Sequence, residues 1–171
     1  APDLRGLGDS SRPIGGYDKM TVANDIWKLV SNELGYSSFL LVGHDWGGPT
    51  AYALAASHPQ AVEKLVILDV VVPGCGGDFS EGGRRWHHQF HMTPDLPEEL
   101  INGREKVYLS WFYRTFAYKP GCITKNDLNE YVRTYKQPGA LRAGFSYYRT
   151  MVQDAKVNAE IIRKFKLPMP V

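Results

Sequence analysis

The stretch Leu41–Gly48, which reads LVGHDWGG, places an aspartate between a short apolar run and a segment of small residues. The run SSFLLVG predicts a buried strand, and GGPTAYALAASHP predicts an Ala-rich helix that ends near Pro59. Gly43 and Gly47 are expected to let strand and helix approach without Cβ clashes. The pattern is typical of a strained turn that exposes one side chain at a helix N-terminus.

The carboxylate at this turn has two interpretations. Asp45 would serve as an ordinary N-cap, a common position for Asp. Alternatively, Asp45 is a covalent nucleophile whose charged form is favoured by the helix dipole. Caps rarely need glycines on both sides, so the pattern favours the nucleophile.

The elements around this turn predict an α/β fold. With 171 residues, 43% of them hydrophobic, the chain is long enough for one domain with a core. TVANDIWKLVSNELG predicts a helix that stops at Gly35, and VEKLVILDVVV predicts a second buried strand. Strand, helix and strand in this order predict a βαβ unit in a parallel sheet covered on both faces.

The character of the chain changes near Pro73. The Gly-rich run PGCGGDFSEGGRRW is typical of a linker or hinge. Three helical segments are expected after it: PEELINGREKVYLSWFYRTFAY, KNDLNEYVRTYK with Thr124 as its cap, and PGALRAGFSYYRTMVQDA. The apolar end KFKLPMPV predicts entry into another strand. Because a core with so few strands is incomplete, we expect the chain to be a segment of a larger molecule.

Composition argues against several classes of protein. The formal net charge is +2 with no basic run, which gives no electrostatic footprint for nucleic acid or an anionic membrane. No window reaches the roughly 18 apolar residues of a membrane span. The N-terminus lacks a signal-peptide pattern but also lacks an initiator Met, so the compartment stays open, with the cytoplasm slightly favoured. Cys75 and Cys122 are free thiols or one bridge.

Five runs together resemble a known superfamily: APDLRGLGDSSRP, GYDKMTVANDI, VGHDWGG, LVILD and YYR. They are similar to the α/β-hydrolase superfamily, in its Asp-nucleophile branch of epoxide hydrolases and haloalkane and haloacetate dehalogenases. The resemblance is greatest to epoxide hydrolases with a His/Tyr ring-opening pair. It implies the α/β-hydrolase fold, a parallel-dominated sheet flanked by helices, with a helical cap inserted after the sixth strand.

On this pattern residues 1–72 belong to the central part of the core, residues 73–165 to the cap, and residues 166–171 return to the core sheet. The family pattern places the first oxyanion loop before Ala1 and the catalytic histidine after Val171. The isolated segment is therefore expected to be inactive.

Two residues at the expected sheet edge have implied roles. Asp69 ends the second strand, where the resemblance implies the triad acid in one sub-branch; a turn-forming Asp is the alternative. The backbone N–H of Trp46 is the implied second oxyanion donor, and its indole N–H is an implied halide ligand. Haloacetate dehalogenases carry arginines where this chain has Trp46 and Pro49, which argues against an acid substrate.

The run WHHQFH contains His87, His88 and His91. His87 and His91 are four residues apart, a spacing that suits a metal, but no HExxH pattern or Cys pair accompanies them, so we expect no metal site. The resemblance implies instead that His87 points at the nucleophile and donates a hydrogen bond to the leaving oxygen or halogen. His88 is its candidate substrate-binding neighbour. A packed or exposed histidine remains the alternative for His87.

In the run FSYYRT, Leu141, Phe145 and Tyr148 share one helix face. The resemblance implies that Tyr148, just before an Arg, binds the epoxide oxygen; an aromatic packing stripe is the alternative. Trp111, in an aromatic-rich helix, is a candidate substrate-binding wall of an apolar pocket. Tyr147 is assigned to packing. Four further tyrosines are left as core or surface: Tyr113, Tyr118, Tyr131 and Tyr135.

The predicted function is hydrolysis of a small apolar epoxide to a vicinal diol, with water as co-substrate and no cofactor. Asp45 would attack carbon to form an alkyl-enzyme ester. A haloalkane or haloacetate dehalogenase with the same nucleophile is the first alternative, and a non-catalytic ligand-binding module is the second. Whether the protein forms a homodimer stays open.

Overall fold

A computed structural model describes residues 1–76, 82–119 and 121–171; part of the predicted Gly-rich linker lies outside these ranges. The first half contains α1 (Lys19–Lys28), a short π-helix (Leu29–Glu33), β1 (Phe39–His44), α2 (Gly47–Ser57) and β2 (Val62–Leu68). This order confirms the predicted helix–strand–helix–strand sequence. The N-cap Asp18 starts α1 by accepting a hydrogen bond from Thr21 N–H, and Gly35, at φ +73°, follows the π-helix.

The two strands are parallel and in register from Phe39↔Val62 to His44↔Leu68, with one irregularity between Phe39 and Leu40. Both strands therefore end at the same edge of the sheet. Asp45 and Asp69 are the next residues, so they occupy neighbouring positions at the carboxyl edge. The second strand is shorter than predicted because Asp69 has φ +50°, a left-handed conformation that ends extended structure.

The core of this half lies between α2 and one face of the sheet. The buried side chains of the cluster are mostly small or aliphatic, which lets α2 lie close to the strands; they are Ala23, Ala51, Ala53, Leu54, Ala55, Val62, Leu65 and Met169. The C-terminal segment joins this core, since Leu167 packs against it and Leu65 N–H donates to Pro170 C=O at 3.0 Å. Residues 165–171 nevertheless form no strand, contrary to the sequence-based expectation.

The opposite face of the sheet is exposed. Side chains alternate along β1, so that Phe39 and Leu41 pack inward while Leu40 and Val42 are 66% and 62% exposed. Val66 and Leu68 of β2 are exposed as well. In the described part of the chain one face of the sheet is covered, and coverage of the other face stays a prediction.

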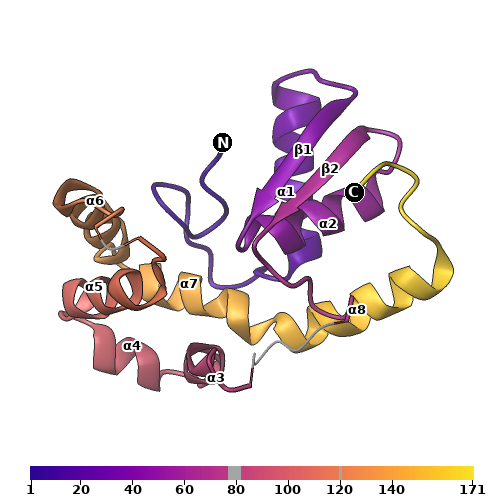
Figure 1. Ribbon diagram of the computed structural model, residues 1–171. Helices are drawn as coiled ribbons and strands as arrows, with labels where there is room; N and C mark the ends of the chain where they lie inside the picture. The colour runs from indigo at the N-terminus through magenta and orange to yellow at the C-terminus, as the bar shows by residue number, and fades with distance from the viewer. Residues whose placement is uncertain (77–81, 120) are drawn as a thin grey trace.

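The second half is helical (Figure 1). It contains α3 (Trp86–Met92), α4 (Leu96–Ile101), α5 (Glu105–Phe116), α6 (Lys125–Tyr135), α7 (Ala140–Arg149) and α8 (Met151–Lys164). Figure 1 shows α7 and α8 following each other beneath the sheet, with α3 to α6 gathered at one end.

Two of the predicted helices are each divided. Gly103, at φ +77°, separates α4 from α5, and Thr150 separates α7 from α8. The predicted cap of α6 is confirmed: Thr124 and Asp127 form a reciprocal capping box. The division of the chain at residues 72 and 165 stays a prediction.

Two other expectations concern the chain as a whole. No helix among the described residues is long and apolar enough to cross a membrane. Cys75 and Cys122 are both exposed and unbridged.

The turn between β1 and α2 brings two backbones unusually close. A Cβ added at Gly43 would lie 2.2 Å from the carbonyl oxygen of Gly47, and one added at Gly48 would lie 2.4 Å from Val70 Cγ1. At Gly47 an added Cβ meets nothing within 4 Å. The approach of β1 and α2 therefore requires Gly43 but not Gly47, which corrects the predicted pair; Gly48 is crowded instead by the side chains of Ile67 and Val70.

We expect Gly43→Ala to lower the free energy of unfolding by about 1–3 kcal/mol, because backbone atoms must move to accommodate the methyl group. Gly47→Ala, the matched control in the same turn, is expected to change stability by less than about 1 kcal/mol. Urea denaturation of the two full-length variants measures both values. Equal effects would contradict the steric argument.

Candidate active site

Asp45 occupies a strained backbone position immediately after β1. Its φ is +50°, which is uncommon for a residue with a side chain and is often found at functional sites. Its carboxylate Oδ1 accepts the backbone N–H of Trp46 at 2.7 Å, and the side chain is exposed. The N-cap position of α2 is held by Trp46 and shows no side-chain cap hydrogen bond. A capping role for Asp45 therefore has little support.

Asp45 and the helical half line a common cavity of about 160 Å³. Asp45 and Trp46 contribute its floor, and Leu7 comes from the N-terminal segment. The remaining lining residues come from four helices and are mostly aromatic: His91, Tyr108, Leu109, Phe112, Tyr113, Tyr135, Gly144, Phe145 and Tyr148. The cavity thus joins a single carboxylate to an apolar wall that carries several phenol groups.

Tyr148 projects into this cavity from α7, where the sequence predicted it. Its ring meets the Trp46 indole edge-on, with ring centroids 4.7 Å apart. Burial, with a smaller contribution from the negative charge of Asp45, holds the pKa of Tyr148 well above its usual value. The phenol is therefore protonated at neutral pH and can donate its proton within the same cavity as the carboxylate.

His91 and Tyr108 form a second polar pair in the lining. His91 Nε2 lies 2.5 Å from the Tyr108 hydroxyl, and the imidazole stacks on Phe145 with ring centroids 4.3 Å apart. Burial lowers the pKa of His91 to about 3, assisted by the neighbouring His87, His88 and Arg149. The imidazole is therefore neutral at physiological pH. The only sequence signal for His91 was its spacing of four from His87.

The other two histidines lie outside this lining. His87 is buried behind it, with its ring centroid 6.0 Å from that of Tyr148. His88 lines a separate groove between α3 and α8 that includes Met151 and Ala155. No group of three potential metal ligands occurs in the part of the chain that the structure describes. The predicted roles of His87 and His88 therefore stay predictions.

Trp111 also lies outside the cavity lining. Its indole is 37% exposed and packs against Trp86 and Phe112, with ring centroids 5.5 and 5.4 Å away. Phe112 lines the cavity and Trp111 packs against Phe112, so Trp111 supports the cavity wall from behind. Its predicted contact with substrate has no counterpart in the cavity lining.

Besides Tyr108, two further tyrosines that sequence motifs did not single out line the cavity. Tyr113 comes from α5 and Tyr135 from the last position of α6. Burial raises the pKa of both phenols; the charge of Asp45 adds to the shift at Tyr135, and Tyr135, Tyr131 and Asp45 add to it at Tyr113. Neither residue lies in a recognisable motif, so only the packing of the helices reveals this position.

Asp69 is exposed at the carboxyl end of β2, and its φ of +50° matches that of Asp45. The position agrees with the sequence-based prediction of a triad acid at the sheet edge. A turn-forming aspartate has the same location, so the role of Asp69 stays a prediction.

Because the imidazole of His91 is buried, the free energy of unfolding depends on pH. Between about pH 6.5 and pH 3 the unfolded chain binds a proton at this residue that the folded chain does not, so stability falls as pH falls through this window. We expect His91→Gln to flatten the loss, measured by urea denaturation of the full-length protein at several pH values. The exposed His44→Gln is the control. An unchanged pH dependence in His91→Gln would contradict the assignment.

Comparisons with known proteins agree with this architecture. The model of the α/β-hydrolase fold family matches residues 1–158. The soluble epoxide hydrolase of Corynebacterium sp. (strain C12) is 39% identical over 99% of this chain and 62% of its own. The fluoroacetate dehalogenase of Burkholderia sp. is 31% identical over 86% of this chain and 51% of its own.

Solved structures give the same result. The ligand-free epoxide hydrolase CorEH superposes with a TM-score of 0.91 at 37% identity, covering 100% of this chain and 62% of that one. Cfl2 from Burkholderia cenocepacia superposes with a TM-score of 0.91 at 39% identity, covering 100% and 60%. This chain therefore spans between about half and three fifths of the length of these relatives, and it belongs to the α/β-hydrolase fold family, in the branch of epoxide hydrolases and dehalogenases.

Proposed function

We propose that the protein hydrolyses a small apolar epoxide to a vicinal diol through an ester on Asp45. The observation that carries the proposal is that a strained, exposed carboxylate and the protonated phenol of Tyr148 line one cavity. Relatives named as epoxide hydrolases support the same reaction class.

In the first step an Asp45 carboxylate oxygen attacks an epoxide carbon and the carbon–oxygen bond of the ring breaks. The developing alkoxide is a poor leaving group, so it takes a proton from Tyr148 Oη. The product is a hydroxyalkyl ester of Asp45. His87 is the proposed second donor to the epoxide oxygen.

In the second step water attacks the carbonyl carbon of the ester. The negative charge that develops on the former carboxylate oxygen is stabilised by the backbone N–H of Trp46, which already lies 2.7 Å from Asp45 Oδ1. Collapse of this intermediate breaks the bond between the acyl carbon and the alkyl oxygen and restores the Asp45 carboxylate. One proton of the attacking water passes to the alkyl oxygen, which leaves as the diol, and the other returns to the Tyr148 phenolate. A general base, oriented by Asp69, activates the water in this scheme.

The lining favours an uncharged substrate. The cavity as described contains no Lys or Arg side chain that would pair with a carboxylate. Trp46 and Pro49 occupy positions where the family resemblance implies arginines in haloacetate dehalogenases. An apolar epoxide fits this aromatic wall better than an acid does.

The proposal predicts that full-length protein converts styrene oxide to diol and that Asp45→Asn abolishes the conversion. Tyr148→Phe is expected to lower kcat by about 10²-fold, because the alkoxide loses its proton donor. Tyr118→Phe, which changes a fully exposed tyrosine, is the matched control and should leave kcat unchanged. Diol release that survives Asp45→Asn would exclude the ester mechanism.

The second donor is tested by comparing His87→Gln with His91→Gln in single-turnover ring opening. A role for His87 predicts a slower formation of the Asp45 ester in His87→Gln than in His91→Gln. The reverse order would transfer the role to the His91–Tyr108 pair, which lines the cavity directly.

A dehalogenase is the second candidate function, since the Trp46 indole lines the cavity and an indole N–H suits a leaving halide. Incubation with a brominated alkane separates the two activities. Halide release without diol formation would favour the dehalogenase, and neither product from a range of substrates would favour a non-catalytic binding module.

A further inference from the structure

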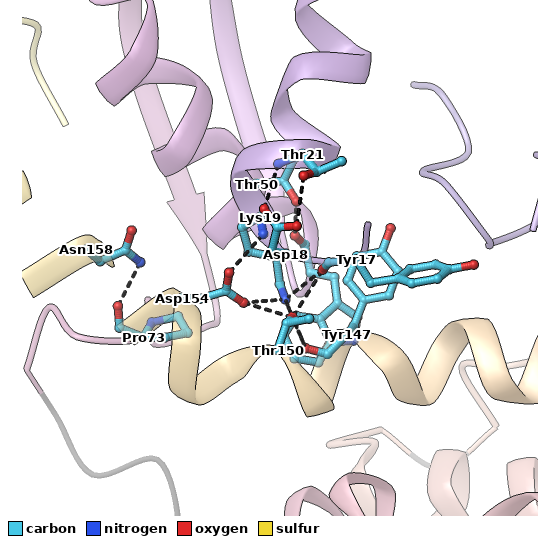
Figure 2. A network of polar contacts seen from close by, with 11 residues as sticks. Tyr17, Asp18, Lys19, Thr21, Thr50, Pro73, Tyr147, Thr150, Asp154 and Asn158 are labelled. Atoms are coloured by element: carbon cyan, nitrogen blue, oxygen red, sulfur yellow. Dashed lines mark hydrogen bonds and ion pairs between the residues drawn. The ribbon is translucent and has the colours of Figure 1, made fainter. Parts of the chain in front are cut away.

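A buried lysine lies directly behind the nucleophile turn. The Lys19 side chain, at the first residue of α1, is 2% exposed, and its ammonium donates to Asp154 Oδ2 at 2.9 Å. It also donates to the Tyr147 carbonyl at 2.9 Å and to Thr150 Oγ1 at 3.0 Å. Figure 2 shows these groups converging where α1 meets the end of α7. All three protons of the ammonium thus have partners.

Asp154 accepts hydrogen bonds from both the backbone and the side chain of Lys19. Its Oδ1 accepts the backbone N–H of Lys19 at 2.9 Å, while its Oδ2 accepts from the ammonium and from the Thr150 hydroxyl at 3.0 Å. Thr150 is the residue that separates α7 from α8. The ion pair therefore joins the start of α1 to the break between the two long helices, across 135 residues of sequence.

The ammonium also contacts both sides of the site. It lies 4.6 Å from the centroid of the Trp46 indole ring and 5.1 Å from that of Tyr147. Trp46 is the neighbour of Asp45 and donates its backbone N–H to that carboxylate. Tyr147, whose carbonyl Lys19 binds, is the neighbour of Tyr148. Lys19 thus contacts the sequence neighbour of Asp45, the proposed nucleophile, and the sequence neighbour of Tyr148, the proposed proton donor.

We propose that Lys19 and Asp154 are positioning residues for the reaction, holding the backbone N–H of Trp46 and the phenol of Tyr148 against Asp45. This inference rests on the proposed function. Lys19 fixes Trp46 through its ring face and fixes Tyr148 through the preceding carbonyl. The pair itself touches no reacting atom.

The free-energy cost of burying the charges of Lys19 and Asp154 supports a role for this pair beyond stabilising the fold. Burial lowers the pKa of Lys19, and the attraction of Asp154 opposes this shift without cancelling it. Two charges removed from water at such a site are often replaceable by apolar side chains without loss of stability, whereas removal of one charge leaves the other uncompensated. If the Lys19–Asp154 pair contributed only to stability, both side chains could thus be replaced together by apolar ones without loss.

The test is the double variant Lys19→Met/Asp154→Leu in the full-length protein, assayed with styrene oxide. We expect a folded protein whose kcat falls by about 10-fold or more while KM changes little, because displaced groups lose their alignment in the transition state. The matched control is Asp9→Asn/Arg133→Met, which removes an exposed ion pair between the N-terminal segment and α6. Its kcat should be unchanged.

A second readout does not depend on activity. The indole N–H resonance of Trp46, assigned with Trp46→Phe, is expected to shift in the double variant and to stay in place in the control. An unchanged kcat together with an unmoved resonance would overturn the inference. A wild-type protein that turns over no epoxide would overturn the proposed function, and the resonance would then decide alone whether Lys19 holds Trp46.

If the double variant does not fold, Thr150→Val provides a milder change, since it removes the hydroxyl that Lys19 and Asp154 share and keeps the side-chain shape. We expect a smaller fall in kcat at unchanged KM. A Thr150→Val enzyme with wild-type kcat and an unmoved Trp46 resonance would contradict the positioning role.

Discussion

The close approach of β1 and α2 at Gly43 is the constraint on which the rest of the site depends. Because the Gly47 carbonyl oxygen lies so near, no side chain fits at Gly43, and the chain that follows adopts a left-handed backbone at Asp45. That conformation presents the carboxylate toward the helical half and places the Trp46 N–H beside it. Every helix that lines the cavity is arranged around this one exposed group.

The helical half completes the site through contacts between residues that are far apart in the sequence. The cavity wall combines residues from α3, α5, α6 and α7, and its phenols and imidazole are kept neutral by burial. In the proposed reaction this neutral wall leaves the Asp45 carboxylate as the nucleophile and the Tyr148 phenol as the acid, without competition from other ionised side chains. The Lys19–Asp154 pair does not line the cavity, and its ammonium contacts the Trp46 ring, which does.

The sequence predicted those features that depend on local chemistry. Asp45 between glycines, the cap at Thr124 and the stop at Gly35 all follow from neighbouring residues, and each has the expected structure. Tyr148 was located by its helical register and by the family resemblance. The breaks at Gly103 and Thr150 were missed because apolar periodicity continues through both.

Features that depend on contacts between residues distant in the sequence leave no recognisable motif or periodicity. Tyr135 and Tyr113 reach the cavity only through the packing of α5 and α6 against α7, and no motif surrounds either residue. The partner of Lys19 lies 135 residues away. The sequence around His91 indicates only the spacing of a metal ligand, whereas its partners in the structure are Tyr108 and Phe145. Single-sequence patterns report periodicity and turns, and they do not report which helix faces meet.

The bare face of the sheet has a practical consequence for handling these 171 residues. Leu40 and Val42 together with Val66 and Leu68 form an aliphatic surface on two adjacent parallel strands. Such a surface favours association with any other apolar surface, including that of an identical molecule. In isolation this stretch of chain should be prone to aggregate in water and to depend on detergent or on covering polypeptide for solubility.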